Sequence, residues 1–535
     1  MKYKKIILAI LLAINMAFAA IGCTNTANTE NSNTVENSVV DTENTEDTEN
    51  TQETSLETEV ESKSEADAKA TIVLSDEGIN IDGDGATAND STLTINSGGT
   101  YTISGSLSAG QIIVNASSTD TVNLILNGVD ITAQENAAIY ASQAEELIIT
   151  LSENTENTLE DATNFTYANK SDEKPDAAIF AKNDLTINGT GSLTVTANFN
   201  NGIGTKDNLV IESGTLNVTA NNHGIRGKDS ITVLDGVINV TAGSDGMQSN
   251  NDKKTDKGWI DLSGGTFNIT ANSDGIQAET NLTISGGEYN IITGGRSSSS
   301  GVQTTNESDS YKGLKANSNI EISNGIFVID SADDSIHSNG NISILGGSFT
   351  LSSGDDAIHA DGDLTITDGT IDVLTSYEGF ESSTMTIAGG TMTIEATDDG
   401  INLSDPNNTS TSFFDGERPN DNLWLLISGG TITIVAGSDA IDSNGNASMT
   451  GGTVDLTAAT LGEGETIDVN GTWEQTGGDL TETGGNSMNG PGGMGGPDNM
   501  GERPDSMGER PDNMGDPPDN MPSNGDEMGN PFQKP

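Results

Sequence analysis

The amino-acid sequence predicts an all-β fold, a parallel β-helix with three short strands in each coil of about 22 residues. The first observation is a repeat, in which an apolar marker residue recurs at steps that are mostly 21 to 24 residues long. The second is an alternation of apolar and polar residues within each repeat, typical of strands buried on one face. The third is that these runs end at Gly-Gly, Asn-Gly or Asp-Gly, which suit tight corners. The repeats lack long amphipathic helical runs, so a helical solenoid is excluded.

The repeats align along most of the chain. Their marker residues are Ile179, Ile203, Ile225, Met247, Ile276, Leu314, Ile336, Ile358, Phe380, Ile401 and Ile441. The longer steps contain loop-like inserts near 251–258, 296–310 and 405–421. With coils about 4.8 Å apart, we expect roughly 15 coils. A right-handed coil is expected because it is the commoner form.

The two ends of the chain differ from the repeats. Residues 1–22 have a basic start and an apolar run too short for a stable membrane span, and they precede Cys23, the only cysteine. This pattern resembles a bacterial lipobox and predicts a lipoprotein signal peptide with a lipid on Cys23; an ordinary secretory signal is the alternative. Residues 23–65 are low-complexity Thr, Glu and Asn, and 484–535 are rich in Gly, Pro, Met and Asp, so both predict disorder. The β-helix is expected to span 66–483.

These ends and the charge limit the compartment and the partners. We expect an exported protein, anchored only by its lipid to the outer face of the bacterial cytoplasmic membrane, without disulfides and monomeric. A formal net charge of -60 argues against nucleic acid, because nothing would neutralise phosphates. It suits a neutral partner, or an anionic partner bridged by cations.

Carboxylates recur at one place in the coil. The lines 333–354 and 355–376 each open with two aspartates and carry Ile-His shortly after. In a β-helix such positions stack, and carboxylates about 5 Å apart repel by roughly 1 kcal/mol in water. Few lysines or arginines adjoin them in the sequence, so we expect Ca²⁺, which prefers oxygen ligands, to neutralise them. The alternative is that aspartate simply favours corners. The predicted ligands are Asp333, Asp334, Asp355, Asp356, Asp398 and Asp399, with Asp245, Asp274 and Asp439 as further members.

The same face carries side chains suited to sugars. A long polar surface that repeats about every 4.8 Å matches an extended glycan, whose hydroxyls bond to carboxylates and imidazoles and whose rings stack on aromatic side chains. The predicted carbohydrate-binding residues are His337, His359, Glu378, Glu381, Tyr311, Tyr377, Trp259 and Trp424. The two tryptophans follow inserts, and pinning those inserts to the coil is their alternative role.

The coil signature, with an acidic pair before Gly-Ile and a later Gly-Gly-Thr-Ile, together with the lipobox and the tail, resembles bacterial cell-surface carbohydrate-binding β-helix proteins. These are similar to polysaccharide lyases of the pectate-lyase superfamily. The resemblance covers roughly 70–480. It implies a right-handed helix, calcium on the acidic face, and binding of cellulose or pectic acid.

Two other functions stay open. A calcium-dependent pectate-type lyase would need a basic residue to remove the uronate C5 proton, and Lys312, Lys315 and Arg226 are its candidates. These residues could equally balance the charge of the carboxylates, and no catalytic motif selects a base among them, so binding without catalysis is favoured. A structural adhesin or surface spacer is the third possibility.

Overall fold

The structure, a computed structural model, describes residues 68–167, 174–299, 310–406, 419–460 and 464–485. The chain divides into two units, Met1–Ser62 and Lys63–Pro535, and all described residues belong to the second. The predictions for 1–22, Cys23, the whole tether 23–65 and nearly all of the tail 484–535 therefore lie outside the described residues. The described strands run from Ala70 to Gly484, and the β-helix bounds of 66–483 stay a prediction.

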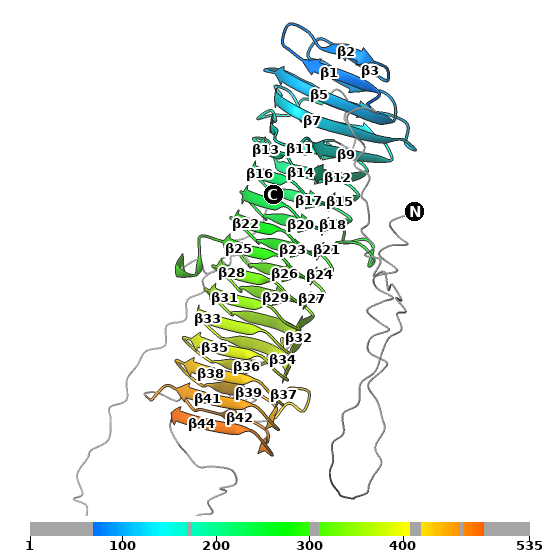
Figure 1. Cartoon of the computed structure of the whole chain (residues 1–535). Coiled ribbons are helices and arrows are strands. Elements are labelled where there is room, and N and C mark those ends of the chain that lie inside the picture. Colours follow the sequence, from blue (N-terminus) through cyan, green and yellow to red (C-terminus); the bar gives the residue numbers. More distant parts are fainter. Residues whose placement is uncertain (1–67, 168–173, 300–309, 407–418, 461–463, 486–535) are drawn as a thin grey trace, which may run out of the picture. The chain divides into compact units, whose positions relative to one another are not determined.

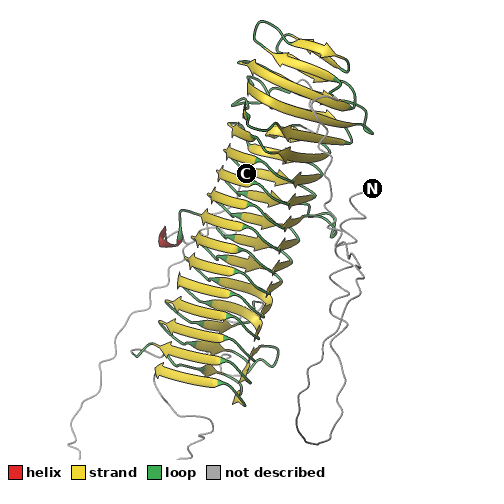
Figure 2. Ribbon diagram, viewed as in Figure 1, coloured by secondary structure: helices red, strands yellow, loops and turns green. Residues whose placement is uncertain are grey.

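The described part is all β, apart from the 3₁₀ turn η3 (Ser297–Ser299), and its strands stack coil on coil (Figures 1 and 2). In the repeats each strand pairs in parallel with the equivalent strand of the next coil, so that Ile336 lies opposite Ile358, Ile342 opposite Leu364, and Phe349 opposite Ile371. The predicted β-helix arrangement with three strands per coil is thus observed. The handedness and the number of coils stay predictions.

Three parallel sheets result. The short-strand sheet contains β4 (Thr92–Ile95), β6 (Gln111–Asn115), β8 (Ile139–Gln143), β11 (Ala177–Ala181), β14 (Asn201–Thr205), β17 (Ile225–Gly227), β20 (Met247–Ser249), β23 (Ile276–Ala278), β26 (Leu314–Ala316), β29 (Ile336–Ser338), β36 (Ile401–Leu403), β39 (Ile441–Ser443) and β42 (Asp468–Val469). The middle sheet contains β9 (Glu146–Leu151), β12 (Asp184–Gly189), β15 (Asn208–Ile211), β18 (Ser230–Val233), β21 (Trp259–Leu262), β24 (Asn281–Ile284), β27 (Asn319–Ile322), β30 (Asn341–Ile344), β37 (Trp424–Ile427), β40 (Asn446–Met449) and β43 (Trp473–Gln475). The long-strand sheet contains β10 (Glu156–Glu160), β13 (Ser192–Ala197), β16 (Thr215–Ala220), β19 (Val237–Ala242), β22 (Thr266–Ala271), β25 (Glu288–Thr293), β28 (Ile326–Ser331), β31 (Ser348–Ser353), β33 (Thr370–Ser376), β35 (Thr391–Ala396), β38 (Thr431–Ala436), β41 (Thr453–Ala458) and β44 (Asp479–Gly484).

Some strands run through a corner and belong to two sheets. β32 (Ile358–Ile366) and β34 (Phe380–Ile387) join the short-strand and middle sheets, and β5 (Gly99–Leu107) and β7 (Thr121–Thr132) join the middle and long-strand sheets. The first coils also contain two antiparallel hairpins, which the repeat pattern does not predict. In these, β1 (Ala70–Leu74) pairs with β2 (Asn80–Gly83), and β3 (Ala86–Asn89) pairs with β4.

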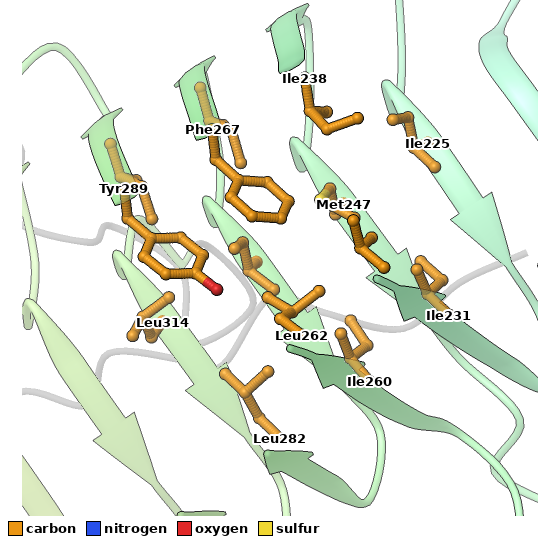
Figure 3. Packing of buried hydrophobic residues seen from close by; sticks show 14 of the residues in the cluster. Ile225, Ile231, Ile238, Met247, Ile260, Leu262, Phe267, Leu282, Tyr289 and Leu314 are labelled. Atoms are coloured by element: carbon orange, nitrogen blue, oxygen red, sulfur yellow. The ribbon is translucent and has the colours of Figure 1, made fainter. Parts of the chain in front are cut away.

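The core lies inside the coils and follows from the alternation. Strands such as Thr215–Ala220 bury every second side chain, and the marker residues are fully buried in one row (Figure 3). Within the core Phe267, Tyr289, Phe327 and Phe349 form a continuous stack, with ring centroids 4.6 to 4.7 Å apart and planes within 6° of parallel. Because such stacks add to the burial of apolar area, the register of neighbouring coils is well determined.

The small residue before each marker has a packing reason. A Cβ on Gly313 would lie 2.4 Å from Ile329 Cγ2 and 2.5 Å from the Ser335 carbonyl oxygen of the next coil. A large side chain there would force the coils apart, which explains why glycine, serine or alanine precedes the marker. Within the described residues, no helix has the length and apolar character needed to cross a membrane.

Candidate functional site

Two rows of side chains run along the outer side of the short-strand sheet. The strand row consists of the residues that follow the markers, and strand pairing places them in direct register. Its members are Gly204, Arg226, Gln248, Gln277, Lys315, His337, His359, Glu381, Asn402, Asp442 and Asp468. The turn row lies two residues before the markers and contains His223, Asp245, Asp274, Lys312, Asp334, Asp356, Glu378, Asp399, Asp439 and Glu465. We call the two rows, with Asp333, Asp355 and Asp398 beside them, the acidic face.

The turn-row carboxylates have a structural role first. Asp334 Oδ1 accepts a hydrogen bond from the backbone N–H of Asp356 at 3.1 Å, and Asp399 Oδ1 accepts one from Asp439 at 2.9 Å. Asp245 does the same for Asp274 at 3.1 Å. Each such aspartate therefore joins its coil to the next with one oxygen and keeps the other for a second partner. The predicted alignment of Asp334, Asp356 and Asp399 on one face is observed.

The chain's own cations neutralise part of this face, which corrects the expectation that few basic groups are nearby. Lys312 Nζ donates to Asp333 Oδ2 at 2.7 Å and lies 3.0 Å from Asp334 Oδ2. Burial opposes the charged form of this amine, but Asp334 and Asp333 raise the pKa of Lys312 well above its usual range. Asp355 has a carboxylate oxygen within 4.8 Å of oxygens of Asp333 and Asp334. Burial, and then the charges of Asp334 and Asp333, raise the pKa of Asp355 to about 6.

The two histidines of the opening repeats lie one above the other, with ring centroids 4.8 Å apart. His337 Nδ1 is 2.7 Å from Asp334 Oδ2, and His359 Nδ1 is 2.9 Å from Asp356 Oδ2 and 3.1 Å from Glu381 Oε2. Burial alone would lower the pKa of His359, but hydrogen bonds to Asp356 and Asp361 raise it to about 11. These carboxylates favour the protonated, positively charged form of His359.

A second cluster has no such cation. Asp399, Asp439 and Asp442 place carboxylate oxygens within 4.8 Å of one another, and in the described part of the chain none of the three forms an ion pair with lysine, arginine or histidine. Burial, and then the neighbouring carboxylates, raise the pKa of Asp442 to about 7 and that of Asp439 to about 6. Asp442 is absent from the predicted ligands. The signal for it was available, because it follows its marker in the strand row, three residues after Asp439.

The other predicted ligands are already partnered. Asp245 lies 3.1 Å from His223 Nδ1 and accepts from Gln248 at 2.6 Å, while Asp274 lies 3.3 Å from Lys315 Nζ and accepts from Ser310 at 2.6 Å. Asp398 hydrogen-bonds with Tyr377, whose pKa rises to about 12 through that bond and the carboxylate's charge. Asp245, Asp274 and Asp398 belong to no close set of three ligand groups among the described residues.

The predicted sugar contacts divide between two sheets. His337, His359, Glu378 and Glu381 lie on the acidic face, and Tyr377, which is 49% exposed, stands beside Glu378. Tyr311 precedes Lys312, and its backbone N–H donates to Asp333 at 3.4 Å.

Trp259 and Trp424 instead begin β21 and β37 in the middle sheet, where they share one outward row several coils apart. The two tryptophans therefore do not adjoin the acidic rows directly.

The basic candidates for a lyase are held by carboxylates. Lys312 is paired as described, Lys315 Nζ lies 3.3 Å from Asp274, and Arg226 lies 3.1 Å from Asp176. Arg226 also lies three rungs of the strand row away from Lys315. The three do not form one basic centre.

The stacked coils and their acidic face define a β-helical repeat protein with a polar surface suited to a long, repetitive ligand. A sequence model described as "Carbohydrate-binding domain-containing protein" matches residues 89–357 and 355–486, and the chain belongs to this family. The family indicated by the coil signature is thereby confirmed. Carbohydrate binding follows at the level of the family.

Two known proteins are similar to this chain. A carbohydrate-binding domain-containing protein of Acetivibrio thermocellus is 40% identical over 152 residues, which are 28% of this chain and 53% of the relative. The chain thus spans about half the length of that relative. A solved structure, the gadolinium derivative of a "polysaccharide lyase-like protein from C. thermocellum", is 38% identical, with a TM-score of 0.42 over 42% of this chain and 92% of the other.

Proposed function

We propose that this protein holds acidic, pectic-type polysaccharide on its acidic face, with calcium bound at Asp399, Asp439 and Asp442. The observation that carries the proposal is the set of three adjacent carboxylates without a protein cation. Partly buried carboxylates repel one another, so a bound cation would relieve a cost that the fold otherwise bears.

The donor set fits calcium. Ca²⁺ takes about six to eight oxygen ligands at about 2.3–2.6 Å, and this cluster offers oxygens only. Asp399 and Asp439 each accept a backbone N–H of the next coil, and Asp399 also hydrogen-bonds with Ser438; each still offers one carboxylate oxygen to the cluster. At Asp333, Asp334 and Asp355 the amine of Lys312 already supplies positive charge, so calcium should bind more weakly there.

Calcium, when bound, would supply positive charge and open coordination positions to a uronate carboxylate. The chain's own residues would do the rest. The rung spacing of about 4.8 Å is close to the length of one sugar in an extended polymer, so successive rungs can meet successive sugars. His337, His359 and Glu381 would bond to hydroxyl groups, and the exposed ring of Tyr377 would stack on a sugar face.

Binding without cleavage is the form we propose. A base for β-elimination must be unprotonated, and Lys312 is held protonated by two carboxylates. We therefore expect no unsaturated uronate, detected by its ultraviolet absorbance, when pectate and calcium are incubated with the protein. Product that disappears in Lys312→Ala would instead establish a lyase.

The test of binding is retardation in a native gel that contains polygalacturonate, with calcium or with EDTA. We expect retardation with calcium only, and at least a tenfold weaker retention for Asp442→Asn. Asp455→Asn removes the same charge from the exposed face of the long-strand sheet and is the matched control. Retention that is unchanged by EDTA and by Asp442→Asn would refute the calcium site.

An absence of retention on any polysaccharide would favour a spacer. Anchoring through Cys23 is a separate part of the proposal. If the Cys23→Ala variant is still labelled with lipid in cells, this part of the proposal is wrong.

A further inference from the structure

A second surface lies on the long-strand sheet, away from the acidic rows. It is a shallow groove of about 300 Å³ that crosses β13, β16, β19, β22 and β25. Its lining contains no ionisable side chain and consists of Thr194, Asn217, Val218, Thr219, Asn239, Val240, Thr241, Asn268, Ile269, Thr270, Asn290 and Ile292. The groove is thus an uncharged polar surface on a chain with a net charge of -60.

The floor of the groove is a ladder of asparagines in register. Asn217, Asn239, Asn268 and Asn290 occupy successive rungs of one row. Asn239 Nδ2 donates to Asn217 Oδ1 at 2.8 Å, and Asn268 Nδ2 donates to Asn239 Oδ1 at 2.9 Å. An amide has two N–H donors and an oxygen with two lone pairs. Asn239 donates one bond and accepts one within the ladder, so it keeps one donor and one acceptor for another molecule.

A row of threonines runs parallel to the asparagines in the same groove. Thr219, Thr241 and Thr270 lie in register two residues further along the strands, and all three are exposed. The row continues to Ile292 and Asp330.

Beyond Ile292 the segment that carries η3 projects from the stack (Figure 2) and is bonded to it through Asp330. Arg296 donates to Asp330 Oδ2 at 2.8 Å, and the Ser297 N–H donates to Asp330 Oδ1 at 2.8 Å. The threonine row therefore ends at the ion pair between Arg296 and Asp330.

We propose that this groove binds an uncharged, extended glycan chain, independently of calcium. A chain that runs along the stack meets one asparagine and one threonine about every 4.8 Å, near the length of one sugar residue. Sugar hydroxyls both donate and accept, which matches the free amide donors and acceptors and the threonine hydroxyls. An anionic chain would gain nothing here, because the lining offers no positive charge and the protein as a whole repels it.

The asparagine ladder also ties the coils together, so the experiment separates the two roles. The probe is hydroxyethyl cellulose in a native gel, with EDTA throughout. The variant is Asn239→Val with Asn268→Val, because the same row carries valine at position 328 and therefore accepts it. The control is Thr393→Val with Thr433→Val, a pair in the same row but outside the groove.

We expect the wild type and the control to be retarded in EDTA, and the asparagine variant to bind at least tenfold more weakly while its melting temperature and its calcium-dependent retention on polygalacturonate are kept. Wild-type protein that is not retarded, or an asparagine variant that binds as tightly as the wild type, would overturn the inference. Neither result would count against the proposed calcium-dependent site, because retention on polygalacturonate is measured separately.

Discussion

Replacing Lys312 by methionine tests how the acidic face is kept stable. The amine lies 2.7 Å from Asp333 and 3.0 Å from Asp334, and the Lys312 and Asp334 side chains are 13% and 3% exposed. At about 3 Å and an effective dielectric constant of about 20, each attraction is about 5.5–6 kcal/mol before desolvation is subtracted. Removing one partner of such a buried pair typically costs about 3–5 kcal/mol, because the other charge stays buried. We expect Lys312→Met to lose this much stability in EDTA.

Calcium should then substitute for the missing amine. The variant leaves Asp333, Asp334 and Asp355 as an all-oxygen cluster within 4.8 Å. A ligand at about 100 times its Kd stabilises the folded state by about 3 kcal/mol, so calcium should restore much of the loss. The assay is guanidinium unfolding of wild type and variant, each with EDTA and with calcium.

The control is Lys254→Met, an exposed lysine of an insert, which should change stability by less than about 0.5 kcal/mol. If the free energy of unfolding of Lys312→Met in EDTA is within about 1 kcal/mol of the wild-type value, a third or less of the expected loss, the reasoning is wrong. It is also wrong if calcium stabilises the variant no more than it stabilises the wild type.

Two further predictions concern the fold. Phe327→Ala interrupts the buried aromatic stack and should lower the free energy of unfolding in guanidinium by about 3–5 kcal/mol. The control is Val328→Ala, at a side chain that is 47% exposed, which should cost far less. Equal losses in the two variants would contradict the role of the stack. Burial raises the pKa of Asp161 to about 6 against hydrogen bonds from the Asn198 and Phe199 N–H groups. Because the folded pKa lies above the unfolded value, wild-type stability falls as pH rises from about 4 to 6, and Asp161→Asn should be more stable at pH 7 by about 1–2 kcal/mol after solvent screening, with no such gain near pH 4. A gain that is the same at both pH values would contradict this assignment.

Most of the fold could be predicted from the repeat period. The markers from Ile179 to Ile441 pair in one row as expected, because each coil buries one apolar side chain at that place and a slip would expose it. The same period placed Asp334, Asp356 and Asp399 on one face. The hairpins β1–β2 and β3–β4 were not foreseen, since they precede the first clear repeat and carry no signal of their own.

The site was predicted less well than the fold. A period fixes the rung on which a side chain stands, but not where a long side chain reaches. The sequence therefore left charge balance as one of two roles for Lys312 and did not identify Asp333 and Asp334 as its partners. Likewise, Asp442 stood in the strand row but was not connected with Asp439, because sequence spacing alone does not show that the turn and strand rows converge. The asparagine groove was not predicted either, because an Asn-x-Thr pattern on a strand also fits an ordinary solvated face.

The most direct test of calcium on the acidic face is a crystal structure of the folded region grown in calcium, with anomalous scattering to locate the ions. We predict a peak between Asp399, Asp439 and Asp442, at about 2.3–2.6 Å from an oxygen of each. Three carboxylates without an ion between them at saturating calcium would contradict the account.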